Sequence, residues 1–121
     1  MMRLTIPGVP PSLNRFAGRK NEWEYRAMKR KWTDAVCWEV KRSGAAIPEP
    51  YPLAKVTITY YFPTAGRHDA DNYAGKFLLD GLTRAGVIVD DDLKHIRTEI
   101  RGECDRKNPR TVIEVFEVAQ R

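Results

Sequence analysis

The fold class is indicated most clearly by residues 53–62, which read LAKVTITYYF. Ala54, Val56, Ile58, Tyr60 and Phe62 occupy every second position of this stretch, and Lys55, Thr57 and Thr59 lie between the first four of them. An alternation of period two is typical of a strand that buries one face. Pro63 and Gly66 end the pattern, so we expect a half-buried strand here.

Helical periodicity flanks this strand on both sides. Before it, apolar side chains recur at spacings of three and four through residues 25–40 and define one apolar face. Asn21 stands just ahead of that stretch, where a helix cap belongs. After the strand, a similar pattern runs through residues 74–85, and Gly86 follows it as a stop signal. We therefore expect one helix before the strand and one after it.

Three further strands complete the expected architecture. They cover residues 3–7, residues 94–101 and residues 111–118. The resulting order, βαβαββ, predicts a two-layer α/β fold in which one mixed sheet carries two helices on one face. At 121 residues the chain has the usual size of one domain, so residues 1–121 are expected to form a single domain.

Composition narrows the class of protein. The net charge of +5 favours an anionic partner. No apolar run approaches the roughly 20 residues of a membrane span, and prolines stand early in the chain, where a signal peptide needs apolar residues. Cys37 and Cys104 are too few and too far apart for a disulfide framework or a zinc site. We expect a cytoplasmic protein with reduced thiols and no membrane partner.

The charge is distributed unevenly along the chain. Residues 1–42 carry ten Lys and Arg against four Asp and Glu, whereas residues 67–92 carry three against six. Residues 93–110 are basic again, with six against three. Because carboxylates repel phosphates, a surface that only binds phosphate would avoid the acidic centre, whereas a site that also holds divalent cations would use it. The alternative is an ordinary solvated surface.

Two acidic runs carry the most chemically informative residues: Arg67-His68-Asp69-Ala70-Asp71-Asn72 and Asp90-Asp91-Asp92. In extended backbone, Asp69 and Asp71 point to the same side, and Asp90 or Asp91 can fold back toward them after the second helix. Mg²⁺ compensates clustered carboxylates well because it prefers oxygen ligands. Such a site suits metal-assisted attack on a phosphodiester, and Lys76 would add a positive charge from the first turns of the helix that Asp71 begins.

The same residues also have an ordinary structural interpretation. Asp71 or Asn72 can cap the following helix, and residues 90–92 can form a polar turn. An EF-hand is excluded, because Tyr73 and Ala74 stand where that motif needs an oxygen ligand and a glycine.

The acidic runs belong to a longer pattern. In chain order its elements are Arg67-x-Asp69-x-Asp71-Asn72, Lys76, Asp80-Gly81-Leu82, Ala85-Gly86-Val87 and Asp90-Asp91. An earlier motif is Pro10-Pro11-Ser12-x-Asn14-Arg15. Together these motifs resemble the RusA family of Holliday-junction resolvases, over nearly the whole chain. Their order and the chain length agree together, which is far more specific than two aspartates alone.

The resemblance implies a small homodimeric endonuclease that cuts four-way DNA junctions with Mg²⁺ and is often carried by phages or prophages. It places the family's metal-binding and catalytic aspartates on Asp69, Asp71 and Asp91, with Asp90 as an assisting neighbour. The family's catalytic lysine falls on Lys76.

The spacing of Lys76 departs from the family's best-known pattern. Lys76 follows Asp71 by five residues, where that pattern has four. Measured back from Asp80, however, Lys76 stands in the expected place, so the extra residue lies within residues 73–75.

The implied DNA contacts suit a branched substrate. A four-way junction has approximate two-fold symmetry, and a symmetric dimer would place one acidic site on each symmetric strand. No nucleotide cofactor is expected, because the chain has no glycine-rich phosphate cradle. The candidate DNA-binding residues are Asn14, Arg15, Arg67 and Asn72, together with Arg26 and Arg30 of the first predicted helix.

Several ring side chains are further candidates. Trp32 lies on the apolar face of the first predicted helix and is expected in the core or in a dimer contact. Trp23 and Trp38 lie off that face and can stack on unpaired bases at a junction centre, as can Phe16. His68 is interpreted as a phosphate contact or a surface residue rather than a catalytic base.

Two alternatives to a junction nuclease stay open from the sequence. One is a non-catalytic, basic DNA-binding module, and the weaker one is a metal-dependent phosphohydrolase that acts on small nucleotides. A pure DNA binder should bind more tightly when Asp71 is neutralised, whereas a nuclease should lose cleavage and keep binding.

Overall fold

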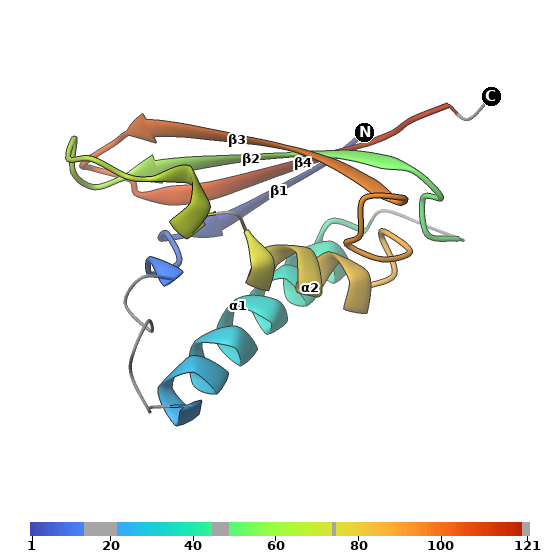
Figure 1. Ribbon diagram of the computed structural model, residues 1–121, viewed down its shortest axis with the longest axis horizontal. Helices are drawn as coiled ribbons and strands as arrows, with labels where there is room; N and C mark the ends of the chain where they lie inside the picture. Colours follow the sequence, from blue (N-terminus) through green and yellow to red (C-terminus); the bar gives the residue numbers. More distant parts are fainter. Residues whose placement is uncertain (14–21, 45–48, 74, 120–121) are drawn as a thin grey trace.

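In the part of the chain that the structure describes, four strands form one mixed sheet with two helices against one face of it (Figure 1). The computed structural model describes residues 1–13, 22–44, 49–73 and 75–119, with only the backbone described at Ala70 and Asp71. The elements are β1 (Met2–Pro7), α1 (Glu22–Arg42), β2 (Ala54–Phe62), the 3-10 helix η2 (Ala70–Tyr73), α2 (Lys76–Arg84), β3 (Ile96–Cys104) and β4 (Arg110–Glu117). The order βαβαββ and the two-layer α/β class are therefore confirmed.

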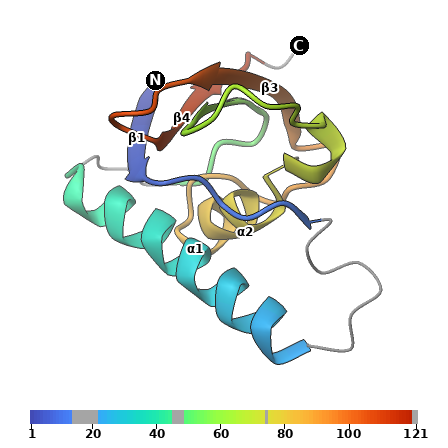
Figure 2. The same ribbon diagram turned by 90° about the vertical axis from the view of Figure 1, so that its left-hand side faces the viewer.

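The sheet has the strand order β1-β4-β2-β3. β4 is antiparallel to both β1 and β2, whereas β2 and β3 are parallel, with Ala54 paired to Ile96 and Phe62 paired to Cys104. A parallel pair needs a crossover connection, and the segment that contains α2 supplies it. β1 and β3 are consequently the two edges of the sheet, and Figure 2 shows the sheet and the helices as two layers.

The core lies between the sheet and the helices. The predicted alternation of β2 is confirmed, because its helix-facing side chains are at most 6% exposed: Ala54, Val56, Ile58, Tyr60 and Phe62. Trp32 of α1 is 5% exposed and belongs to the same core cluster, as its place on the apolar face predicts. Leu78 and Leu82 contribute the facing side chains of α2.

The two helices make close contact with each other. The hydroxyl of Thr33 in α1 donates to the carbonyl oxygen of Phe77 in α2, with 3.4 Å between the two oxygens. Gly81 faces Val36 so closely that an added Cβ would lie 2.6 Å from the Val36 Cβ. A glycine at this position therefore permits the close packing of α1 on α2.

Three features differ from the sequence-based expectations. α2 begins at Lys76 and not at Asp71, because Gly75 has a left-handed φ of 84° that separates α2 from η2. β3 continues beyond residue 101 to Cys104. Thr57 and Thr59 are buried although they lie on the polar face of β2, because β2 is flanked on both sides by β3 and β4. Asn21, the predicted cap of the first helix, lies outside the described residues.

Neither α1 nor α2, nor any other described helix, has the length and apolar character needed to cross a membrane. Cys37 and Cys104 are both free, and Cys104 is exposed.

Candidate functional site

Asp69 lies at the end of the sheet where β2 and β3 finish. Its carboxylate is exposed and accepts a hydrogen bond from Nε of Arg67, at 2.8 Å. It also lines a hollow of about 90 Å³ together with Ile100, Arg101 and Gly102 of β3, and we call this the Asp69 hollow. Two of the predicted site residues, Arg67 and Asp69, are thus brought together as an ion pair.

An aromatic cluster supports the segment that carries Asp69. The His68 ring stacks on the Phe62 ring, with centroids 3.7 Å apart and planes within 7°. Tyr73 packs edge-on against both Phe62 and Tyr60. Burial, together with the neighbouring Tyr73 hydroxyl, raises the pKa of the Tyr60 hydroxyl. His68 therefore helps to fix this segment on the end of β2, a packing role that its sequence position did not reveal.

The expected geometry of Asp69 and Asp71 is wrong in one respect. The prediction that both point to the same side assumed extended backbone, but residues from Ala70 to Tyr73 form η2. The backbone N–H of Asn72 donates to the carbonyl oxygen of Asp69 at 3.0 Å, as a turn of helix requires. The side chain of Asp71 lies outside what the structure describes.

A second acidic group joins Asp80 of α2 to Asp90 and Asp91, which follow that helix, and we call it the Asp91 cluster. The backbone N–H of Asp91 donates to the Asp90 carboxylate at 2.8 Å. Partial removal from water raises the pKa of the Asp91 carboxyl, and so do a hydrogen bond with the Asp90 carboxyl and the negative charges of Asp80 and Asp90. The carboxylates of Asp80 and Asp90 are thus close enough to Asp91 to disfavour its ionisation.

Asp80 entered the sequence pattern only as a spacing landmark, and its part in this cluster was not predicted. Its Oδ2 atom is buried without a hydrogen-bond partner, and the Lys29 ammonium lies 3.7 Å away. The signal in the sequence is that Asp80 is the single acidic residue among the apolar residues of this helix, five of which are buried in the structure. A lone acid in so apolar a helix calls for a partner or a function.

Asp92 has a structural role, as the polar-turn interpretation predicts. Its carboxylate accepts hydrogen bonds from the backbone N–H of His95 at 3.1 Å and contacts the His95 ring at 2.5 Å. The hydrogen bond with His95 lowers the pKa of the Asp92 carboxyl. Asp92 therefore holds the turn that leads into β3.

The two acidic groups lie at different places in the fold. η2 lies beneath the half of the sheet where β2 and β3 end, and the segment after α2 lies on the other side of α2 (Figure 1). Among the described residues, no three His, Cys, Asp or Glu side chains form a group that could hold a metal ion. The structure joins Asp91 to Asp90 and Asp80, and Asp69 to Arg67.

The two motifs of the longer sequence pattern meet in space. Pro10, Pro11 and Leu13 line one small hollow with Asn72 and Lys76. Lys76 is exposed and is the first residue of α2. The segment after β1 therefore packs beside the start of α2, although about 60 residues separate them in the sequence.

Four of the remaining predicted residues, Trp23, Arg26, Arg30 and Trp38, belong to α1. Arg26 and Arg30 are exposed, and Arg26 forms an ion pair with Glu22 at 3.5 Å. Trp23 and Trp38 are 81% and 66% exposed, so both indole rings are available to a partner. Asn14, Arg15 and Phe16 lie outside the described residues.

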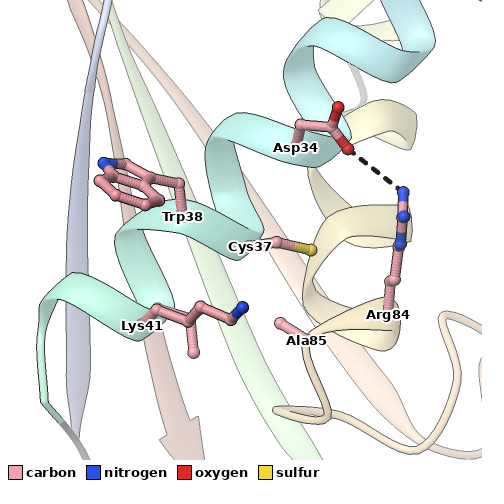
Figure 3. Close-up of a pocket in the computed structure, with 7 residues that line it drawn as sticks. Asp34, Cys37, Trp38, Lys41, Arg84 and Ala85 are labelled. Atoms are coloured by element: carbon pink, nitrogen blue, oxygen red, sulfur yellow. Dashed lines mark hydrogen bonds and ion pairs between the residues drawn. The ribbon is translucent and has the colours of Figure 1, made fainter.

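A hollow of about 460 Å³ lies between the carboxyl-terminal parts of α1 and α2 (Figure 3). Cys37 points across it toward α2, and Arg84 forms an ion pair with Asp34 at 3.2 Å. Trp38 and Lys41 also line it. Of the predicted metal and catalytic residues whose side chains are described, Asp69, Lys76, Asp90 and Asp91, none lines this hollow.

Comparisons with models of protein families and with curated proteins find no match to this chain. Any assignment of function therefore depends on the motifs and on where the fold places them.

Proposed function

We propose that this chain is a Mg²⁺-dependent, structure-selective endodeoxyribonuclease that resolves four-way DNA junctions by paired nicks. The observation that carries the proposal is the hollow shared by Pro10, Pro11, Asn72 and Lys76. The two motifs that resemble the RusA family lie far apart in the sequence, but residues of both line this hollow. Their contact supports a single site to which both motifs contribute.

The chemistry of the acidic residues fits Mg²⁺. Asp90 and Asp91 offer only oxygen donors. Burial, followed by the neighbouring carboxyl groups, raises the pKa of Asp91, and a divalent cation relieves the repulsion between such carboxylates. The buried Oδ2 of Asp80 has no hydrogen-bond partner, and its charge is compensated by the Lys29 ammonium at 3.7 Å. Because Asp69 and Asp71 lie on the other side of α2 from Asp90 and Asp91, each pair would offer its own oxygen ligands to a metal. Bound Mg²⁺ would supply a water of lowered pKa and a Lewis acid for the phosphodiester.

Lys76 and Arg67 would bind and orient the phosphate. Lys76 begins α2, where the helix dipole and the free backbone N–H groups also favour an anion. Arg67 now neutralises Asp69, and exchange of that partner for a phosphate would leave the Asp69 carboxylate open to a cation. The exposed Arg26 and Arg30 of α1 would add phosphate contacts farther from the cut.

Asp71→Asn tests the proposal directly. We expect the variant to lose Mg²⁺-dependent cleavage of a synthetic four-way junction while it still binds the junction, because the substitution removes a ligand charge and leaves the basic surface intact. Asp92→Asn is the matched control, since Asp92 holds a turn and should be dispensable for cleavage. A linear duplex of the same sequence measures selectivity. Unchanged cleavage by Asp71→Asn would remove the metal site and the proposal with it.

A non-catalytic DNA-binding module is the second candidate. The ion pair between Arg67 and Asp69 favours it, because Arg67 already compensates the charge of that carboxylate. Its signature would be a wild-type protein that never cuts the junction and an Asp71→Asn variant that binds DNA more tightly than the wild type.

A further inference from the structure

β3 is an edge strand of unusual length and openness. It spans nine residues, six of them exposed, and it contains neither proline nor lysine. The opposite edge strand, β1, spans six residues and ends at Pro7. Proline and charged side chains, lysine above all, commonly protect an edge from pairing with another chain. β3 has neither proline nor lysine, and its protection is limited to arginine and glutamate side chains, which permit pairing only where opposite charges meet.

The backbone of β3 shows which groups face outward. The Ala54 N–H donates to the His95 carbonyl oxygen at 2.9 Å, and the Asp105 N–H donates to the Phe62 carbonyl oxygen at 2.8 Å. Odd-numbered residues of β3 therefore direct their backbone groups toward β2. Because the direction alternates along a strand, Thr98, Ile100 and Gly102 direct theirs away from the sheet.

Charged side chains follow one face of β3 in alternating sign: Arg97, Glu99, Arg101 and Glu103. Within the chain, Glu99 lies 3.4 Å from the Lys55 ammonium and 3.0 Å from the Arg101 guanidinium, so a partner's arginine would join an existing ion-pair network. Ile100 is the middle residue of the strand. If a second copy paired in antiparallel fashion about Ile100, Arg97 would lie opposite its Glu103, and Glu99 opposite its Arg101. If the centre moved to residue 99 or 101, like charges would face each other instead. Pairing about residue 98 or 102 would also oppose unlike charges, but it would overlap only part of the strand. Pairing about Ile100 matches all four charged positions and overlaps all nine residues of β3.

We propose that β3 is the surface through which two copies of this chain associate, in antiparallel pairing with the two-fold axis at Ile100. The outward groups of Thr98, Ile100 and Gly102 would then exchange backbone hydrogen bonds, and the two four-stranded sheets would become one. The charged positions form the non-hydrogen-bonded pairs, in which opposite side chains approach most closely.

The proposed nuclease makes paired nicks and therefore requires two sites in a dimer, but that proposal does not identify the surface that joins the two copies. The β3 interface adds that surface. Arg101 and Gly102 belong both to β3 and to the Asp69 hollow. Association through β3 would therefore place the Asp69 hollows of the two copies beside the shared strand pair.

Charge reversal tests the interface by sedimentation velocity over a range of protein concentrations, without DNA or metal. The wild type should be a dimer, and Glu99→Arg should weaken it by about tenfold or more, because arginine would then face arginine twice. The double variant E99R/R101E should restore the dimer. Glu117→Arg, an exposed reversal on β4, is the matched control and should stay dimeric.

A crosslinking experiment tests the register. Opposite residues of a non-hydrogen-bonded pair have Cα atoms about 4.5 Å apart, which a disulfide can span. In a Cys104→Ser background, Glu99→Cys mixed with Arg101→Cys should form a mixed disulfide faster than either variant alone. A monomeric wild type, or a dimer that resists Glu99→Arg and forms no mixed disulfide, would overturn the proposal. A β3 dimer that fails to cut junctions would instead contradict only the proposed function.

Discussion

Gly75 is the single residue on which the position of Lys76 depends. It has a φ of 84°, and an added Cβ would lie 2.4 Å from Cδ1 of Ile58. The left-handed backbone of Gly75 separates η2 from α2, and α2 begins at the next residue, Lys76. Gly75 lies within residues 73–75, where the spacing between Asp71 and Lys76 is one residue longer than in the RusA pattern that the sequence resembles.

Gly75→Ala should therefore be strongly destabilising. We expect a loss of about 2–5 kcal/mol in the free energy of unfolding, from left-handed strain of roughly 1–2 kcal/mol and overpacking against Ile58 of roughly 1–3 kcal/mol. Urea denaturation measures it. Gly86→Ala is the matched control, because Gly86 has a φ of 79° but no atom within 4 Å of an added Cβ. Equal losses for the two variants would show that the contact with Ile58 is unimportant.

Asp105 provides a second test at the residue scale, through pH. Hydrogen bonds from Arg110, at 2.8 Å, and from the backbone N–H of Asn108 and Lys107 lower the pKa of the Asp105 carboxyl. A lowered folded-state pKa stabilises the protein above the ordinary pKa of aspartate, and the contribution disappears as pH falls through the folded value. The Tm difference between wild type and Asp105→Asn should thus be largest near neutral pH and shrink toward pH 2. A constant difference would contradict this assignment.

At the scale of elements, the sequence predicted most where the pattern is periodic. The alternation in β2 and the apolar face of α1, including Trp32, correctly indicated which side chains are buried. Periodicity could not locate the start of α2, because the conformation of Gly75 decides it and nothing in the spacing encodes that choice. It also could not reveal the Asp91 cluster, since Asp80 and Asp91 are joined only when α2 packs and the following segment turns back beside it.

The contact between α1 and α2 yields a prediction that opposes helix propensity. Alanine is favoured over glycine inside a helix by about 1 kcal/mol, yet Gly81→Ala should destabilise the protein by about 1–3 kcal/mol, because its Cβ would meet Val36. Thermal or urea unfolding measures the change. The exposed Ala27 of α1 is the control: Ala27→Gly should also destabilise, so opposite substitutions would have the same sign. A stabilising Gly81→Ala would mean that the helices separate at little cost.

At the scale of the whole molecule, charge sets how DNA would be held. The chain carries 21 Lys and Arg against 16 Asp and Glu, and the acidic residues gather in the central segment. Part of the basic charge is already used inside the molecule, since Lys29 lies beside Asp80 and Arg84 pairs with Asp34. The cations left for phosphate are therefore fewer than the composition suggests.

Variants of Arg30 and Arg84 distinguish an exposed cation from one that is already ion-paired within the molecule. Arg30 is exposed on α1, so Arg30→Gln should weaken junction binding and reduce the slope of log K against log salt by about 1, the change expected for one lost phosphate contact. Arg84→Gln should leave the slope unchanged, because Arg84 is already paired with Asp34. Both are measured by fluorescence anisotropy from 50 to 200 mM salt, roughly the range in which counterion release dominates, without Mg²⁺ so that cleavage does not intervene. Equal slopes for both variants would place DNA away from this face of α1, and Arg30 would then be a solvated surface residue.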